Sequence, residues 1–199
     1  KEVELTDCTF ANNSVSQATG AAIYAETSLE SFKLLYCNFI NCTADGGDKA
    51  FLSMDENDTP TVAIEVVGCT FSELQHVHNS SVHVISKGNR FTFEDNSFIN
   101  LKCSGDYGGS GLYIESNSPN TTLKGCKFIN CRSSDSQICV RSAGAGTQYT
   151  FEKCTFSYST TEDEQNTRAV YIFGDIPVTF DTCDFLDYTK GPTGFVVSA

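Results

Sequence analysis

The chain has 199 residues, 40% of them hydrophobic, which suffices for one ordinary domain or for a short solenoid with its own core. Lys and Arg number 13 against 25 Asp and Glu, so the formal net charge is -12, which disfavours nucleic acids and anionic membranes as partners because the chain repels them. No apolar run approaches the roughly 18 residues of a membrane-spanning helix. Without an initiator Met or a leader-like segment, we expect a mature segment, either whole or cut from a longer chain.

A Cys-x-Phe pattern recurs along the sequence and divides residues 1–199, which we expect to form one domain, into seven repeats. Successive anchors are 29, 32, 27, 30, 28 and 29 residues apart. The differences fall in Gly-, Ser-, Asp- and Asn-rich stretches, where loops accept insertions. The anchors are Cys8, Cys37, Cys69, Asn96, Cys126, Cys154 and Cys183.

Each repeat is expected to contain three short strands. The first strand, as at 91–95 or 178–182, places apolar residues five and three positions before the anchor. The anchor and the Phe two positions later begin the second strand with the opposite parity, so the backbone must bend between the two strands. The third strands are expected at 21–26, 51–54, 82–86, 111–116, 138–142, 170–174 and 195–198.

Three strands in a repeat of about 29 residues predict an all-β fold, a parallel β-helix of about seven coils. An immunoglobulin-like sandwich also has closely spaced strands, but it does not explain a repeating Cys-x-Phe pattern. Equivalent residues of neighbouring coils should lie about 4.8 Å apart. One aromatic stack should therefore run through the core, formed by Phe10, Phe39, Phe71, Phe98, Phe128, Phe156 and Phe185.

Ten cysteines without a CxxC pair favour an oxidising compartment over zinc ligation. The anchor cysteines should stack as well, either as small buried thiols or in disulfides between coils. Cys103 and Cys131 lie in adjacent coils and could bond to each other. Alternatively, Cys42 and Cys131 could bond to their own anchors, Cys37 and Cys126.

Five Asn-x-Ser/Thr sequons give further support to an extracellular location. They lie at Asn12, Asn41, Asn57, Asn79 and Asn120, where we expect glycans in a eukaryotic protein. Asn12 and Asn41 each follow an anchor by four residues. Their side chains should either carry glycans at an outward corner or form a buried Asn ladder that continues to Asn100 and Asn130.

Two short motifs carry a resemblance to known proteins. GAAIYAE at 20–26 and FANN at 10–13 resemble the GGAI and FxxN repeats of polymorphic outer membrane proteins and similar surface β-helix proteins of bacteria and protists. Only the first repeat has both motifs, and elsewhere the second one reads FIN. The resemblance implies a right-handed parallel β-helix outside the cell, of pectin-lyase-like architecture, with a role in adhesion or surface structure.

Enzymes with the pectin lyase fold often act on polysaccharides through charged side chains on an outer strand face. Here we expect the third strands to present outward Tyr24, Leu52, His83, Tyr113, Cys139, Tyr171 and Val196. Because no pair of carboxylates suited to acid–base catalysis stands out there, we expect no enzymatic activity. Tyr24, Tyr113 and Tyr171 could instead contact sugar rings.

Two patterns could contribute metal ligands, although neither is a full ligand set. His76, His78 and His83 lie close together in the sequence and could bind a transition metal, while DGGD at 45–48 offers only two acids for calcium. We expect these residues to be ordinary surface residues, and we expect no cofactor.

The sequence therefore predicts an extracellular structural or adhesive surface glycoprotein. The alternatives are a carbohydrate-binding module and a divergent polysaccharide lyase or hydrolase. The chain ends show no polar cap, since Val3 and Leu5 already occupy core positions and the last strand lies in GFVVSA at 194–199. We expect copies, or neighbouring β-helix segments, to stack end to end.

Overall fold

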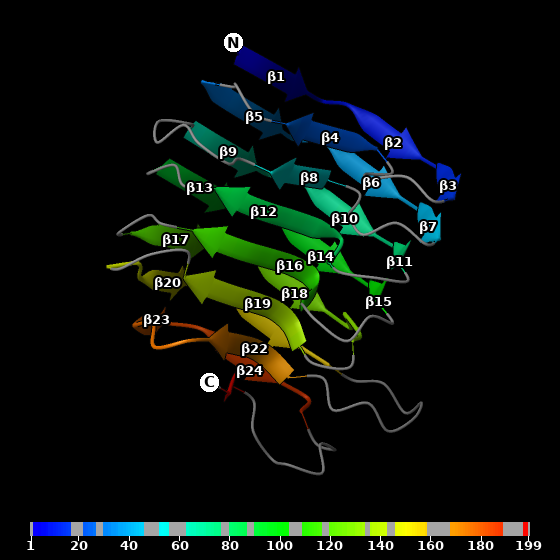
Figure 1. The fold of residues 1–199 in the computed structure, drawn as a ribbon. Helices are drawn as coiled ribbons and strands as arrows, with labels where there is room; N and C mark the ends of the chain where they lie inside the picture. Colours follow the sequence, from blue (N-terminus) through cyan, green and yellow to red (C-terminus); the bar gives the residue numbers. More distant parts are fainter. Residues whose placement is uncertain are drawn as a thin grey trace.

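The computed structural model describes residues 2–16, 22–26, 30–45, 52–55, 63–76, 80–86, 90–103, 109–116, 120–133, 136–142, 146–158, 168–188 and 197–198. All regular structure in these ranges is β-strand, and they contain no helix that is long and apolar enough to cross a membrane. The strands pair in parallel to form four sheets, and each sheet runs along the axis on which the repeats stack (Figure 1). The predicted fold class, an all-β parallel solenoid, is confirmed.

We name the sheets A to D in the order in which each repeat visits them. Sheet A contains the strands before the anchors: β1 (Glu2–Thr6), β5 (Ser31–Leu35), β9 (Ala63–Val67), β13 (Arg90–Glu94), β17 (Thr121–Lys124), β20 (Tyr149–Glu152) and β23 (Val178–Asp181). Sheet B contains the strands after the anchors: β2 (Thr9–Ala11), β6 (Asn38–Ile40), β10 (Thr70–Ser72), β14 (Ser97–Ile99), β18 (Lys127–Ile129), β21 (Thr155–Ser157) and β24 (Asp184–Leu186).

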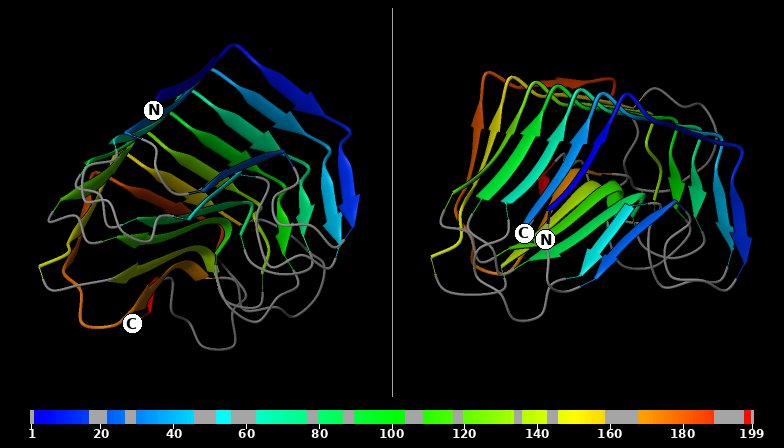
Figure 2. Two further views of the ribbon diagram at one scale, coloured as in Figure 1. Left: turned by 45° about the horizontal axis from the view of Figure 1, so that its top comes forward. Right: turned by 90° about the horizontal axis from the view of Figure 1, so that it is seen from above.

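Sheet C is the short sheet of the first four repeats: β3 (Ser14–Ser16), β7 (Thr43–Asp45), β11 (Gln75–His76) and β15 (Lys102–Cys103). Sheet D closes each repeat: β4 (Ile23–Glu26), β8 (Leu52–Asp55), β12 (Val82–Ser86), β16 (Gly109–Ser116), β19 (Ser136–Ser142), β22 (Arg168–Phe173) and β25 (Val197–Ser198). Seen from the N-terminal end, the chain turns clockwise as it recedes, which is the right-handed sense (Figure 2).

Sheet C corrects the prediction of three strands in every repeat. Its strands are only two or three residues long and follow directly after the second bend. Such short segments carry too few residues to show an alternating pattern. A single bridge between Lys102 and Arg132 extends the pairing of this sheet toward the fifth repeat.

Left-handed backbone conformations make both bends. The first bend is the residue before each anchor, with φ between 53° and 63°, and this is where the change of parity predicted a corner: Asp7, Tyr36, Gly68, Asp95, Gly125, Lys153 and Thr182. The second bend lies four residues after an anchor, with φ between 49° and 64°: Asn12, Asn41, Glu73, Asn100, Asn130 and Asp187. Asn and Asp tolerate this conformation better than most residues, which accounts for their frequency there.

The predicted aromatic stack runs through the whole core. Its six neighbouring pairs have ring centroids 4.6–5.3 Å apart and interplanar angles of 5–12°. The five inner rings are fully buried, whereas Phe10 and Phe185 in the outermost layers are only partly buried. The spacing equals the strand separation in a sheet, so the backbone pairing itself sets the ring stack.

The register of sheet D corrects one expected face. Leu52 pairs with Ile23 and Val82, in the inward row, whereas Ser53 pairs with Tyr24 and His83. The prediction that Leu52 belongs to the row of Tyr24 and His83 was therefore wrong by one residue in the register. Val196 lies outside the described ranges, and Ser198 is the residue in register with Tyr171.

Candidate functional site

None of the ten cysteines, all of which lie in the described ranges, forms a disulfide, which corrects the disulfide predictions. The wrong pairings are Cys103 with Cys131, Cys37 with Cys42, and Cys126 with Cys131. Register explains the first case, because Lys102 pairs with Arg132, so that Cys131 shares a row with Leu101 and not with Cys103. The other two pairings fail because each thiol contacts backbone carbonyls at its own corner.

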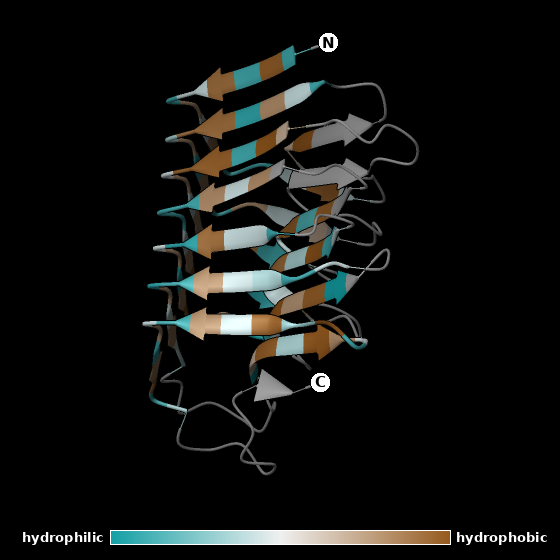
Figure 3. Ribbon diagram, turned by 90° about the vertical axis from the view of Figure 1, so that its left-hand side faces the viewer, coloured by the Kyte–Doolittle hydropathy of each residue, from teal (hydrophilic) through white to brown (hydrophobic). Residues whose placement is uncertain are grey.

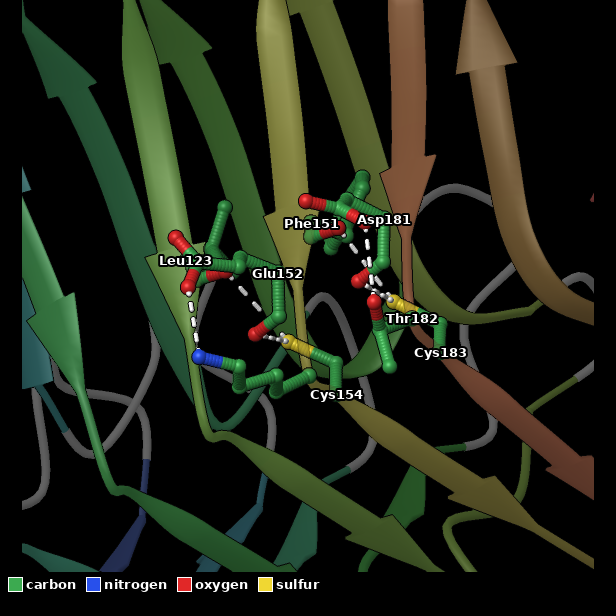
Figure 4. Close-up of polar contacts among 8 residues, drawn as sticks. Leu123, Phe151, Glu152, Cys154, Asp181, Thr182 and Cys183 are labelled. Carbon is green, nitrogen blue, oxygen red and sulfur yellow. Dashed lines mark hydrogen bonds and ion pairs between the residues drawn. The ribbon is translucent and has the colours of Figure 1, made fainter.

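The anchor thiols act as hydrogen-bond donors at the first corner. Cys37 Sγ lies 3.3 Å from the carbonyl of Leu35 and 3.5 Å from that of Leu5 in the preceding repeat. Cys154 and Cys183 repeat this arrangement with distances of 3.3–3.6 Å (Figure 4). The carbonyls of Leu35 and Glu152 also accept backbone amides of the preceding layer, so each thiol adds a second donor to a carbonyl at the corner. The thiols therefore stabilise the corner.

Asn96 performs the same task where the cysteine ladder is interrupted. Its Nδ2 donates to the carbonyl of Val66 at 2.8 Å, the position that a thiol reaches in the other repeats. Its Oδ1 accepts from the amide of Cys69 at 2.9 Å. The side chain is fully buried. In this repeat the carboxamide of Asn96 therefore replaces the thiol as the hydrogen-bond donor.

A second, shorter set of thiols serves the other corner. Cys42 Sγ contacts the carbonyls of Ile40 and Phe10, and Cys131 Sγ contacts those of Ile129 and Phe98, at 3.3–3.6 Å. Burial raises the pKa of Cys69 to about 11 and that of Cys131 to about 12. Since the thiolate is the reactive form, these buried thiols are poor nucleophiles at neutral pH.

The sequon residues that the structure describes lie on the surface. Asn12 and Asn41 are exposed at the second corner, and Nδ2 of Asn41 donates to Oδ1 of Asn12 at 2.8 Å. The prediction of a buried Asn ladder was therefore wrong: Asn12 and Asn41 are exposed, and Glu73 takes the corner position of the next repeat, where it accepts from Asn100. Asn120 is also exposed and accepts from Gln148 Nε2. Asn57 and Asn79 lie outside the described residues.

The tyrosines predicted to contact sugars share one outward row of sheet D but are not neighbours. Ser53 and His83 separate Tyr24 from Tyr113 in the register, and Cys139 separates Tyr113 from Tyr171. The side chain of Tyr24 lies outside what the structure describes. Other residue types therefore interrupt the tyrosine row that the sequence predicted.

Charged and aromatic side chains fill the space beside Tyr113. Its hydroxyl donates to Glu115 Oε2 at 2.9 Å, its ring stacks on His83 at 4.6 Å, and Arg141 lies 3.8 Å from Glu115. Burial, followed by the hydrogen bond to Glu115, raises the pKa of Tyr113. The hydrogen bond with Tyr113 is the largest cause that raises the pKa of Arg141.

Arginines also lie over the rings at the C-terminal side of this face. Arg141 is 4.8 Å from the centroid of Phe173, and Arg168 is 5.9 Å from that of Tyr171. Such cation–π contacts hold the guanidinium groups on the sheet. We call Tyr113, Glu115, Arg141, Tyr171 and Phe173 the outer-face cluster. Sequence reasoning missed Glu115, Arg141 and Phe173, although each is two residues after a residue of the predicted row.

The histidines and the DGGD motif do not form a metal site in the part of the chain that the structure describes. His76 is in sheet C, whereas His83 is in sheet D and stacks on Tyr113; His78 lies outside the described residues. Asp45 ends β7, and residues 46–48 are also outside. Among the described residues, no three His, Cys, Asp or Glu side chains lie close enough to hold a metal ion.

Comparisons with protein-family models, curated proteins and solved structures found no match for this chain. Functional inference therefore rests on its own residues and their geometry.

Proposed function

We propose that this protein is an extracellular structural or adhesive surface glycoprotein, a β-solenoid segment whose two ends join further solenoid layers. One observation carries the proposal, namely that the core ladders continue into the outermost layers. Val3 and Phe10 are partly exposed, whereas their equivalents one layer further in, Phe32 and Phe39, are at most 1% exposed. A further layer of the same kind would bury these side chains, as the inner layers already do.

The last repeat presents the same kind of surface. Val178, Phe180, Cys183 and Phe185 are partly buried, although the core positions that they occupy are fully buried in the repeat before. Among the described residues, β1 and β23 are the outermost strands of sheet A, and each pairs with a strand on one edge alone. Figure 3 shows that the alternation of apolar and polar residues in sheet A continues into β1 at the N-terminal end. Open edges of this kind favour strand addition.

The extracellular part of the proposal is supported by the exposed sequon residues and by the resemblance to surface β-helix proteins. The free thiols are compatible with an oxidising environment, because burial raises the pKa of Cys69 and Cys131 and so keeps the reactive thiolate rare. Mass spectrometry of the native protein from its source tests the proposal. Glycans at Asn12 or Asn120 would support it. Unmodified sequons in a protein that surface labelling of intact cells does not reach would contradict it.

Carbohydrate binding is a second candidate function, which the outer-face cluster favours. Phe173 is 47% exposed and lies beside Arg141, a combination that can contact the apolar face and the hydroxyl groups of a sugar. A glycan array with the wild-type protein and with Phe173→Ala tests this function. Tyr36→Ala is the control, since Tyr36 is 58% exposed at the first corner of the second repeat, whereas Phe173 belongs to sheet D of the sixth repeat. Binding lost only in Phe173→Ala would support the site, and absence of binding to any glycan would contradict it.

A further inference from the structure

We propose that stacked anchor thiols of neighbouring repeats bind the soft cation Cu(I) between them, with one sulfur ligand on each side of the ion. One site lies between Cys37 and Cys69, and the other lies between Cys126 and Cys154. All four side chains are at most 1% exposed, and none of them belongs to the first or the last repeat. The sites go beyond the proposed surface role and do not depend on it.

The parallel register places the two thiols of each site in directly adjacent layers. Strands β18 and β21, which follow Cys126 and Cys154, pair without a shift, as do strands β17 and β20, which precede them. Around Cys37 and Cys69, the strand pairs β6 with β10 and β5 with β9 are also in register. The anchors themselves are therefore in register on both sides of the first corner.

The two sulfur atoms of a site occupy the same position in their repeats. Cys126 Sγ lies 3.5 Å from the carbonyl of Lys124, and Cys154 Sγ lies 3.5 Å from that of Glu152 (Figure 4). Each sulfur also contacts a carbonyl of the preceding layer, at 3.6 and 3.4 Å. Because equivalent atoms of neighbouring layers repeat at about 4.8 Å, the two sulfur atoms are about this far apart.

The proton affinities of the thiols show that the two members of each site interact. The Cys126 thiol is the largest cause that raises the pKa of Cys154, and burial is the second. Burial is the largest cause that raises the pKa of Cys69, and the charge of Cys37 raises it further. Two neighbouring thiolates repel each other, so a cation between them would remove the repulsion and favour their ionised forms.

A linear unit of sulfur, metal and sulfur fits the separation of the layers. With metal–sulfur bonds of about 2.3 Å, as in zinc thiolates, its sulfur atoms would be about 4.6 Å apart, close to the layer spacing of about 4.8 Å. Thiolates are soft ligands and favour Cu(I), whereas Mg²⁺ and Ca²⁺ prefer oxygen ligands. Structural Zn²⁺ sites require four ligands, and the described side chains contain no candidate group of even three. The geometry therefore favours an ion that accepts two sulfur ligands.

N–H groups directed at the sulfur atoms would stabilise the bound thiolates. The backbone amide of Cys37 donates to Cys69 Sγ at 3.4 Å. Nδ2 of Asn96 lies 4.0 Å from Cys126 Sγ and is a weaker donor to it. The bound unit of one Cu(I) and two thiolates carries a single negative charge, and such donors offset part of the cost of burying it.

Binding exchanges protons for the metal ion without a redox step. Two S–H bonds break, two metal–sulfur bonds form, and both protons pass to the solvent, while copper remains Cu(I). The carbonyls of Lys124 and Glu152 lose a thiol donor, but each keeps the hydrogen bond from a backbone amide of the preceding layer. The corner therefore retains its backbone hydrogen bonds when the ion is bound.

Anaerobic competition between the 199-residue protein and a chelating dye for Cu(I) tests the proposal. The chain is refolded from urea in the presence of Cu(I), so that burial of the thiols does not limit the entry of the ion. We expect one ion at each site of the wild type. Cys37→Ser combined with Cys154→Ser should abolish both sites, because these are the middle members of their ladders and their loss leaves no two anchor thiols in adjacent layers.

Cys42→Ser combined with Cys131→Ser is the matched control. These two thiols are also buried and contact two carbonyls each, at 3.3–3.6 Å. Their neighbours in the register are Leu74 for Cys42 and Leu101 for Cys131, and neither leucine offers a metal ligand. The control should therefore bind as much Cu(I) as the wild type, and circular dichroism reports whether each variant keeps its strands.

X-ray absorption of the loaded wild type gives a second measurement, which needs no variant. We expect two sulfur ligands for each Cu(I). A folded wild type that binds no Cu(I) in the competition would overturn the proposal, as would equal losses in the two double variants. Coordination by three or more sulfur atoms, or equally tight binding of Zn²⁺, would contradict the linear geometry. None of these results bears on the surface role, which glycan occupancy and surface labelling test separately.

Discussion

The side-chain amide of Asn96 lies 2.8 Å from the carbonyl of Val66, where cysteine thiols of other repeats reach the equivalent carbonyl. This hydrogen bond shows which chemical property the anchor position requires. The position requires a small buried side chain that donates to the corner of the preceding repeat, and either a thiol or a carboxamide meets that requirement.

Replacing Asn96 should therefore distinguish a donor from a mere space filler. Asn96→Cys should cost less than about 1 kcal/mol of unfolding free energy, because a thiol can donate to Val66 and accept from the Cys69 amide, as Cys69 Sγ accepts from Cys37 N at 3.4 Å. Asn96→Ala should cost at least about 2 kcal/mol, because it leaves buried backbone groups without their partners. Urea unfolding curves measure both. Equal costs for the two variants would refute the donor role.

The buried thiols should make the fold sensitive to alkali. Their pKa values are raised in the folded protein, to about 11 for Cys69 and about 12 for Cys131, from 9.0. The stability that they contribute is complete below pH 9.0 and is lost as the pH rises through the folded values, since the unfolded thiols release their protons first. The urea midpoint should fall over this range. Cys131→Leu, which copies Leu74 and Leu101, should reduce the slope.

Alkylation of the native protein gives an independent measure of the same thiols. At neutral pH the buried cysteines should react slowly with iodoacetamide, and all ten should react in denaturant. Cys8 and Cys183, which are only partly buried, should be the first to react. Mass spectrometry after timed quenching gives the order. Rapid modification of Cys69 or Cys131 in folded protein would contradict the corner geometry.

Both the backbone conformation and the neighbouring ring of Tyr36 require glycine at position 68. Its φ is 63°, and a Cβ atom there would lie 2.5 Å from the ring of Tyr36. Gly68→Ala should therefore cost about 1–2 kcal/mol for the left-handed backbone, plus the cost of displacing the ring. In a Tyr36→Ala background only the backbone part should remain. Thermal unfolding of the four proteins in this cycle measures the coupling, and strict additivity would rule out the ring contact.

The aromatic stack should be most sensitive in its middle. Phe128→Ala removes a fully buried ring between two stacked neighbours and should destabilise the chain by about 3–5 kcal/mol. Phe10→Ala removes a partly buried ring and should cost about half as much in the monomer. Chemical denaturation at low protein concentration compares the two. A cost for Phe10→Ala that matches that of Phe128→Ala would mean that the first layer is already covered.

The features that the sequence revealed are those that repeat with the same parity in every layer. The Phe stack and the bend before each anchor could be predicted because one spacing fixes both. Leu52 was assigned to the wrong face because the short segment around it is apolar at consecutive positions. The disulfides were predicted from the positions of the cysteines in adjacent coils or beside their anchors, and these positions do not give the direction of Sγ. Contacts such as Arg141 with Glu115 join different repeats without a shared motif, so only the register could reveal them.

Mass spectrometry of the protein isolated from its source, together with surface labelling of intact cells, tests the extracellular account most directly. The account predicts that the exposed Asn120 carries a glycan and that the protein is labelled on intact cells. Unmodified Asn12, Asn41 and Asn120 in a protein that the label does not reach on intact cells would contradict it.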